Sequence, residues 1–145
     1  MVDLSPLFYF KDHIKIVDQR FLPLELKYVY CRSAKDVFTA IRRMKIRGAP
    51  AIGIAGAFGL YLAMRSFKSN DKARFVKKLE SVARYLASSR PTAVNLCWAL
   101  EEIVKKVESN LHEPVYRLKD IAYKEAVNIM KDDQKRCRDM GRFGA

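Results

Sequence analysis

An almost uncharged stretch, PAIGIAGAFGLYLAMR, occupies residues 50–65 and carries its one charge on the last residue. Proline fits the first position of a helix, where no backbone N–H donor is needed, so we expect a helix that begins at Pro50. Apolar residues cover nearly its whole circumference, which is typical of a helix enclosed by others. Gly53, Gly56 and Gly59 are spaced by three and predict a strip where a neighbouring backbone approaches closely. The stretch therefore indicates the centre of a helical bundle.

Four more helices are expected around it, because apolar residues recur every three or four positions in four other segments. Their stripes are Ala34, Val37, Ile41 and Met44; Phe75, Leu79, Val82 and Leu86; Ala93, Leu96, Cys97, Leu100, Ile103, Val104 and Val107; and Val115, Leu118, Ala122, Ala126 and Ile129. Ser33 is placed to cap the first of the five helices, and Asn70 or Asp71 the third. Pro91 and Pro114 are placed to begin the fourth and fifth.

The first 31 residues have the two-residue period of strands. The large residues on one face of the later strand are Leu24, Leu26, Tyr28 and Tyr30. Ile14 and Ile16 flank Lys15 in the same way, and residues 18–23 supply the connection. The predicted fold class is α+β, mainly α, with a small antiparallel β-ribbon over residues 1–31 and about five bundled helices over residues 33–140.

The composition excludes several classes of protein. Lys and Arg exceed Asp and Glu by 28 to 16, a formal charge of +12 on 145 residues. Half of the residues are apolar and 11% are aromatic, which is too many for a disordered chain and predicts one packed domain. The uncharged run over residues 48–64 is shorter than the roughly 20 residues of a membrane span, and the N-terminus lacks the pattern of a signal peptide. We expect a cytoplasmic protein that does not enter a membrane.

Metal, cofactor and nucleic-acid binding are not expected either. The three cysteines, at positions 31, 97 and 137, form no C-x-x-C pair, and the two histidines are isolated, which indicates neither a zinc site nor a disulfide framework. The basic residues could attract a nucleic-acid backbone, but they are spread over several helices and mixed with acids. That distribution favours a solvated helical surface.

The strongest candidate site is RGAPAIG at residues 47–53. A helix that begins at Pro50 leaves its first N–H groups unpaired, and the helix dipole makes that end partly positive. Gly48 lets the backbone approach a phosphate, and Arg47 can add charge-assisted hydrogen bonds. The alternative is a surface arginine ahead of a helix whose glycines serve packing alone, and the spacing does not decide between the two.

A second segment, RPTAVN at residues 90–95, repeats this design. Arg90 again precedes a proline, and Ser88, Ser89 and Thr92 are possible additional donors. Two such helix starts can converge on one phosphate if the bundle brings them to the same end. The alternative is that Ser89 or Thr92 simply caps the helix. The repetition favours the binding interpretation.

These two segments also carry a resemblance to a known family. Residues 46–55, IRGAPAIGIA, and residues 89–96, SRPTAVNL, with Trp98-Ala99-Leu100 close behind, resemble the N-terminal signature of the methylthioribose-1-phosphate isomerases. DQR at residues 18–20, followed by Leu22-Pro23, is similar to the early strand and turn of that family. The resemblance covers essentially the whole chain. The wider family includes ribose-1,5-bisphosphate isomerases and the regulatory subunits of translation initiation factor 2B.

The resemblance implies an aldose-ketose isomerase of methionine salvage that converts methylthioribose-1-phosphate into methylthioribulose-1-phosphate. It implies that Arg47, Gly48, Ala49 and Arg90 bind this sugar phosphate. It also implies a Rossmann-like C-terminal domain that supplies a catalytic cysteine and aspartate, and a homodimer of the complete enzyme. Neither catalytic residue has a counterpart in this chain.

Residues 1–145 are therefore expected to form a substrate-capping domain that is inactive alone, with residues 141–145 as the start of a hinge to the missing domain. Two alternatives stay open: a regulatory or scaffolding module like the initiation-factor subunits, and part of a ribose-1,5-bisphosphate isomerase. The contacts that would separate the two sugar phosphates lie partly in the missing domain.

Overall fold

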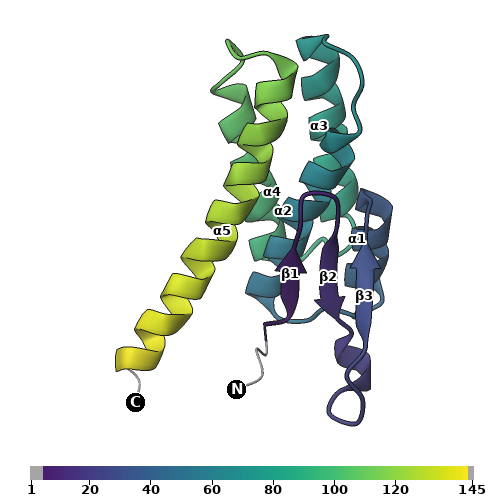
Figure 1. The fold of residues 1–145 in the computed structure, drawn as a ribbon, viewed down its shortest axis with the longest axis vertical. Coiled ribbons are helices and arrows are strands. Elements are labelled where there is room, and N and C mark those ends of the chain that lie inside the picture. The colour runs from purple at the N-terminus through teal and green to yellow at the C-terminus, as the bar shows by residue number, and fades with distance from the viewer. Residues whose placement is uncertain (1–4, 144–145) are drawn as a thin grey trace.

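Three short strands form one antiparallel sheet in the order β1-β2-β3 in the computed structural model, which describes residues 5–143 (Figure 1). They are β1 (Leu7–Tyr9), β2 (Ile14–Val17) and β3 (Tyr28–Cys31), and a 3-10 turn, η1 (Gln19–Phe21), lies between the last two. Ile16 of β2 pairs with Leu7 on one side and Val29 on the other. The predicted ribbon is confirmed and gains a third strand.

The outer strand is shorter than the alternation predicts. Leu24 and Leu26 lie before β3 and are 92% and 55% exposed, so the prediction that they belong to the strand is wrong. Tyr28 and Tyr30 do share a face, but it is the exposed one. The core-facing positions of β3 go to the smaller Val29 and Cys31, because these pair with the inward residues of β2.

Five helices follow the sheet, as the sequence predicts (Figure 1). They are α1 (Ala34–Arg42), α2 (Ala49–Arg65), α3 (Lys72–Ala87), α4 (Val94–Glu108) and α5 (Val115–Phe143). Every residue of α2 from Ile52 to Leu62 is buried, and α2 contacts each of the other four helices. The central helix of the bundle is therefore confirmed.

The glycines of α2 allow this central position. A Cβ placed on Gly53 would lie 2.9 Å from the carbonyl oxygen of Asn95 in α4, and one on Gly59 would lie 3.0 Å from Val37 in α1. A Cβ on Gly56 would overlap the side chain of Leu96. The expected close approach is confirmed, and the strip serves two helices, α4 and α1.

The predicted caps of α1 and α3 are present. The hydroxyl oxygen of Ser33 accepts a hydrogen bond from the N–H of Asp36 at 3.1 Å, and the carboxylate of Asp71 accepts one from the N–H of Arg74 at 3.2 Å. Both satisfy N–H groups that a helix start would otherwise leave unpaired.

Met44 does not continue the apolar stripe of α1. It lies past the end of the helix, has a φ of 58° and is 47% exposed. The N–H of Lys45 donates to the carbonyl of Ala40 at 2.9 Å, and the N–H of Met44 donates to the carbonyl of Ile41 at 3.1 Å. These two hydrogen bonds end the helix and turn the chain, so that Ile46, the residue after Lys45, enters the core.

The two later helices differ from the sequence prediction at their ends. Pro91 does not begin α4; it lies in a turn closed by a 3.0 Å hydrogen bond from the N–H of Ala93 to the carbonyl of Arg90. In α5, Gly141 does not break the helix, which continues to Phe143; of the hinge expected at 141–145, residues 144 and 145 lie outside the described part. The second half of α5 extends away from the bundle (Figure 1).

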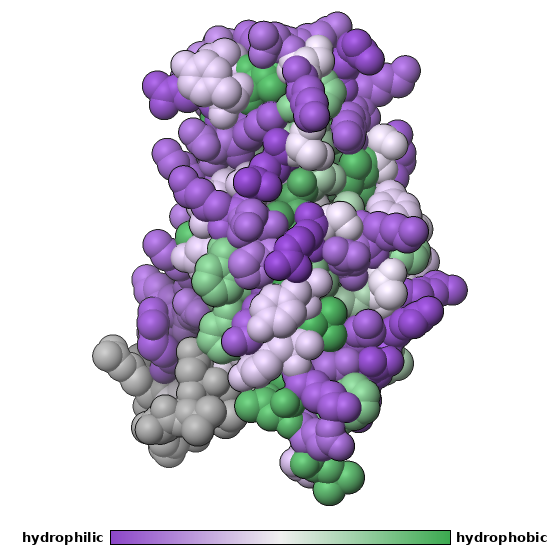
Figure 2. Space-filling model, turned by 45° about the vertical axis from the view of Figure 1, so that its right-hand side comes forward, coloured by the Kyte–Doolittle hydropathy of each residue, from purple (hydrophilic) through white to green (hydrophobic). Residues whose placement is uncertain are grey.

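The surface is mainly polar, and Figure 2 shows hydrophilic side chains over most of one face with smaller apolar areas between them. Exposed aromatic residues of the sheet region include Phe10, Tyr28 and Tyr30. Across the described residues, no helix combines the length and apolar character that a membrane span requires.

Candidate functional site

The first predicted motif forms the exposed start of α2. Residues 47–50 are exposed, and Gly48 precedes the helix with a φ of 93° and no side chain to cap it. The first hydrogen bond of the helix runs from the N–H of Ile52 to the carbonyl of Gly48 at 3.0 Å. The N–H groups of Ala49 and Ala51 are therefore left without a partner inside the helix.

The second predicted motif lies in the turn between α3 and α4. Arg90 is half-buried there, and α4 begins after Ala93 without a side-chain cap. Ser89 is buried and its hydroxyl donates to the carbonyl of Leu86 at 2.6 Å, while the hydroxyl of Ser88 donates to Tyr85. The prediction that these two serines are free donors is wrong, because they close the end of α3.

The structure brings the two helix starts together. Gly53, in the first turns of α2, touches the backbone of Asn95 at the start of α4, and Gly56 lies against Leu96. The two helices thus run side by side in the same direction, and their N-termini lie at one end of the bundle.

These two ends differ from the starts of α1 and α3. α1 and α3 have side-chain caps, whereas α2 and α4 have none. Unpaired N–H groups and the positive ends of two helix dipoles face the same region. Among the described residues, neither Arg47 nor Arg90 forms an ion pair.

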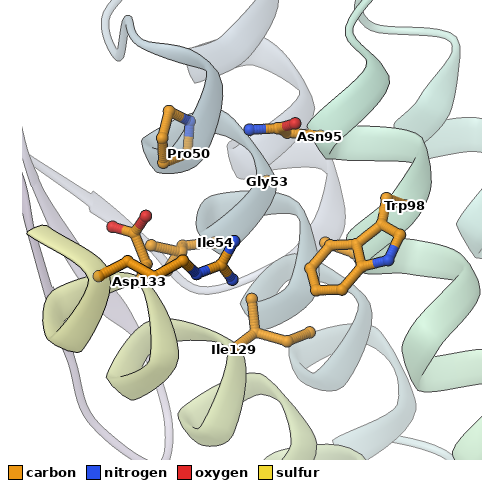
Figure 3. Close-up of a pocket in the computed structure, with 9 residues that line it drawn as sticks. Pro50, Gly53, Ile54, Asn95, Trp98, Ile129 and Asp133 are labelled. Atoms are coloured by element: carbon orange, nitrogen blue, oxygen red, sulfur yellow. The ribbon is translucent and has the colours of Figure 1, made fainter.

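A cavity of about 120 Å³ lies next to these ends, between α2, α4 and α5 (Figure 3). Its lining residues are Pro50, Gly53, Ile54, Asn95, Trp98, Ala99, Ile129, Asp133 and Arg136. Sequence reasoning did not select the residues of α5 for a site. The available signal was Asp133, which comes four residues after Ile129 and so continues the apolar stripe of α5 with a carboxylate.

The cavity adjoins both motifs. Trp98 also borders a surface hollow with Pro91 and Thr92, which follow Arg90. Asp133 also borders a second hollow, which lies between α2, α5 and the start of β1 and includes Gly48. Residues of both arginine segments thus line the cavity, namely Pro50 and Gly53 of the first and Asn95 of the second, although neither arginine does.

The loop that carries Arg47 is held from the sheet. Asp18 is buried and accepts hydrogen bonds from the side chain of Arg20 at 2.9 and 2.8 Å, and this pairing holds the pKa of Asp18 below its usual value. The next N–H, of Gln19, donates to the carbonyl of Lys45 at 2.8 Å. The DQR segment thus fixes the chain two residues before Arg47.

The cysteines are placed apart. Cys31 is buried, and burial raises the pKa of its thiol to about 12, so it is unreactive at neutral pH. Cys97 is half-buried and Cys137 is exposed. Within residues 5–143, no three His, Cys, Asp or Glu side chains are arranged to hold a metal ion.

The fold and this end of the bundle define a small α+β domain with two adjacent, arginine-flanked helix N-termini that suit an anionic ligand. The sequence places it more closely: residues 45–145 match the Initiation factor 2 subunit family, and the chain belongs to that family.

Named relatives include two kinds of sugar-phosphate isomerase. The chain is 43% identical over 142 residues to the 5-deoxyribose 1-phosphate isomerase of Moorella thermoacetica, covering 98% of this chain and 40% of that protein. It is 44% identical over 131 residues to the methylthioribose-1-phosphate isomerase of Pelotomaculum thermopropionicum, covering 90% of this chain and 36% of the relative.

Solved structures agree with this assignment. The translation initiation factor eIF-2B subunit delta from A. fulgidus superposes with a TM-score of 0.88 at 36% identity, over 98% of this chain and 41% of that one. The 5-methylthioribose 1-phosphate isomerase from Pyrococcus horikoshii gives a TM-score of 0.83 at 37% identity, over 88% of this chain and 36% of that one. The chain thus spans about two fifths of the length of these relatives.

Proposed function

We propose that this chain is the substrate-capping N-terminal domain of an aldose-ketose isomerase that converts methylthioribose-1-phosphate into methylthioribulose-1-phosphate. The observation that carries the proposal is the pairing of two uncapped helix starts, each next to an arginine, at one end of the bundle. Relatives named as isomerases of 1-phosphorylated pentoses supply the class of ligand for such a site.

Each site residue then has a distinct role. Arg47 and Arg90 contribute charge-assisted hydrogen bonds to the phosphate from two sides. Gly48 adopts the positive φ that turns the free N–H groups outward, and Ala49 offers its N–H to a phosphate oxygen. These groups bind and orient the ligand, and none of them moves a proton between its carbons.

The chemistry requires a second domain in this proposal. A catalytic cysteine and aspartate from a Rossmann-like C-terminal domain would transfer hydrogen between the first two carbons, and the complete enzyme would be a homodimer. The last part of α5 suits a bridge to that domain, because beyond Met130 its described side chains are mostly exposed and charged. The methionine-salvage reaction and a cytoplasmic location belong to the same proposal.

Two other functions draw on specific observations. The Moorella relative favours 5-deoxyribose 1-phosphate as the substrate, which differs from methylthioribose-1-phosphate only in the group on C5. The initiation-factor neighbour, with a TM-score of 0.88, favours a regulatory module with no catalysis.

The test joins residues 1–145 to the C-terminal portion of the Moorella relative and measures isomerisation of both sugar phosphates. Activity on either one supports the isomerase proposal, and the ratio of kcat/KM values names the substrate. Arg47→Ala and Arg90→Ala should each lower kcat/KM by at least about tenfold, the usual effect of losing a charged hydrogen bond. Arg65→Ala, at the opposite end of α2, is the matched control. A correctly folded fusion that isomerises neither compound would favour the regulatory module.

A further inference from the structure

A row of exposed apolar and aromatic side chains leads into β3 and continues along it. Every second residue of this segment belongs to the row, which consists of Leu22, Leu24, Leu26, Tyr28 and Tyr30. Their exposed fractions are 46%, 92%, 55%, 38% and 50%. The alternating side chains therefore face away from the core. An exposed apolar row of this kind is typical of a surface that contacts another molecule.

The backbone of β3 is open on one side. In the order β1-β2-β3 this strand lies at the edge of the sheet, with β2 as its one neighbour (Figure 1). The N–H of Asp18 donates to the carbonyl of Lys27 at 2.7 Å, and the bonded pairs of an antiparallel ladder recur every two residues. Val29 is therefore bonded to β2 as well, whereas the N–H and C=O groups of Tyr28 and Tyr30 point outward. In the described part of the chain, no other element forms a hydrogen bond to these outward groups.

β3 lacks the features that usually protect an edge strand. Such edges are normally blocked by a charged side chain, a proline or a bulge, because open backbone groups pair readily with another chain. The strand reads Tyr-Val-Tyr-Cys and contains neither a charged residue nor a proline, and its register with β2 is continuous. Tyrosine and valine also favour extended structure. Just before the strand, the ammonium group of Lys27 is paired with the carboxylate of Glu25 at 3.1 Å, which offsets its charge.

A second copy of the same strand fits this open edge. Tyr28 and Tyr30 lie symmetrically about Val29, so two antiparallel β3 strands centred on Val29 place Tyr28 of one copy opposite Tyr30 of the other. The outward N–H and C=O groups of each opposite pair then form two hydrogen bonds, and a two-fold axis relates the two pairs. The tyrosine rings lie on the same exposed face, where aromatic residues in opposite positions stabilise paired strands.

We propose that β3 pairs antiparallel with β3 of a second copy of this chain, which joins two three-stranded sheets into one sheet. The absence of charge within the strand lets two chains with a formal charge of +12 approach at this edge. Because the strand has only four residues, we expect a weak dimer that is half formed at about 0.1 mM. The pairing is independent of the isomerase function, since none of the residues proposed to bind phosphate lies in β3.

Two measurements on the 145-residue protein test this pairing. Analytical ultracentrifugation between about 10 μM and about 1 mM should show a monomer that becomes a dimer. Hydrogen exchange followed by NMR should show that the amides of Tyr28 and Tyr30 exchange about fourfold more slowly at the higher concentration, because fewer chains remain monomeric. The amide of Val29 is bonded to β2 in the monomer, so its exchange should change far less and serves as the internal control.

A charged variant tests the edge directly. Tyr30→Glu places a carboxylate on the pairing strand, so dimerisation should require at least about tenfold higher concentration. The new side chain faces Lys15, its partner in β2, and this opposite charge should preserve the fold of the monomer. Tyr116→Glu makes the same change at an exposed tyrosine of α5, should leave dimerisation unchanged and is the matched control.

Three results would overturn the pairing. The first is a chain that stays monomeric up to 1 mM. The second is a dimer in which the Tyr28 and Tyr30 amides exchange as fast as in the monomer and which Tyr30→Glu does not weaken. The third comes from the fusion with the C-terminal portion of the Moorella relative: if both amides are protected there and remain so after Tyr30→Glu, the second domain covers this edge instead of a second copy.

Discussion

Gly53→Ala tests whether the contact between α2 and α4 holds the two helix starts together. In an open helix this change stabilises a protein by about 0.5–1 kcal/mol, since alanine has the higher helix propensity. Here the new Cβ would lie 2.9 Å from the carbonyl oxygen and 3.2 Å from the carbonyl carbon of Asn95. Both are backbone atoms, which cannot rotate away, so the helices must separate by a few tenths of an ångström.

The magnitude follows from these two opposing effects. Overpacking of this kind costs about 1–3 kcal/mol, so after the propensity gain we expect a net loss of about 1–2 kcal/mol. For a chain of this length such a loss lowers Tm by about 3–7 °C. The separation also moves Arg47 relative to Arg90, so affinity for a sugar phosphate should fall by more than the change in stability alone explains.

Gly141→Ala in α5 is the matched control, because a Cβ there would meet no atom within 4 Å. Thermal unfolding followed by circular dichroism should show an unchanged or slightly raised Tm for this variant, and its ligand affinity should not change. If Gly53→Ala raised Tm as Gly141→Ala does, the close contact of the two helix starts would be refuted.

Three further changes test the turn before α2, the ion pair that holds the Arg47 loop, and a carboxyl pair at the far end of α4. Gly48→Ala should cost about 1–2 kcal/mol in urea unfolding from its φ of 93° alone, since no atom lies within 4 Å of the new Cβ; an unchanged stability would contradict that backbone conformation. Asp18→Asn should cost about 2 kcal/mol at pH 7 by removing a charged acceptor. Because the pKa of Asp18 is lowered by Arg20, its contribution is present above the unfolded pKa and lost as the pH falls, so the variant and the parent should converge in urea unfolding near pH 2. Glu80→Gln should stabilise the protein at pH 7 by less than about 0.5 kcal/mol but should not stabilise it at pH 3. The hydrogen bond with Glu80 raises the pKa of Glu108, so the stability that this hydrogen bond confers is lost as the pH rises. Equal effects of the variant at both pH values would contradict this pairing.

The helical part of the fold could be predicted because its signals are local. Ser33 and Asp71 cap the helices that follow them through bonds spanning three residues, and the all-apolar stretch after Pro50 has no stable place except inside a bundle. The strand that begins at Tyr28 could not be predicted in the same way, because alternation defines two faces without saying which one is buried. The answer lay in the pairing with β2, which is a long-range contact.

In the candidate site, too, the local features could be predicted and the long-range ones could not. Arg47 and Arg90 stand out because each lies one to three residues before a proline near a helix start. The role of Ser89 depended on whether it faces the helix behind it or the one ahead. The cavity joins residues from α2, α4 and α5, and no sequence spacing relates them. Asp133 could be noticed as a charged residue on the apolar face of α5. The periodicity alone does not predict which residues of other helices this side chain faces.

The two ends of α2 show why the open end is the one suited to a ligand. At the C-terminal end the ammonium group of Lys119, from α5, donates hydrogen bonds to the carbonyls of Arg65 and Phe67, so the negative end of the dipole is neutralised within the chain. At the N-terminal end no described side chain caps the helix, because the residue at the N-cap position is Gly48. The exposed N–H groups at that end are left to water. In our proposal, the phosphate of the ligand takes the place of this water.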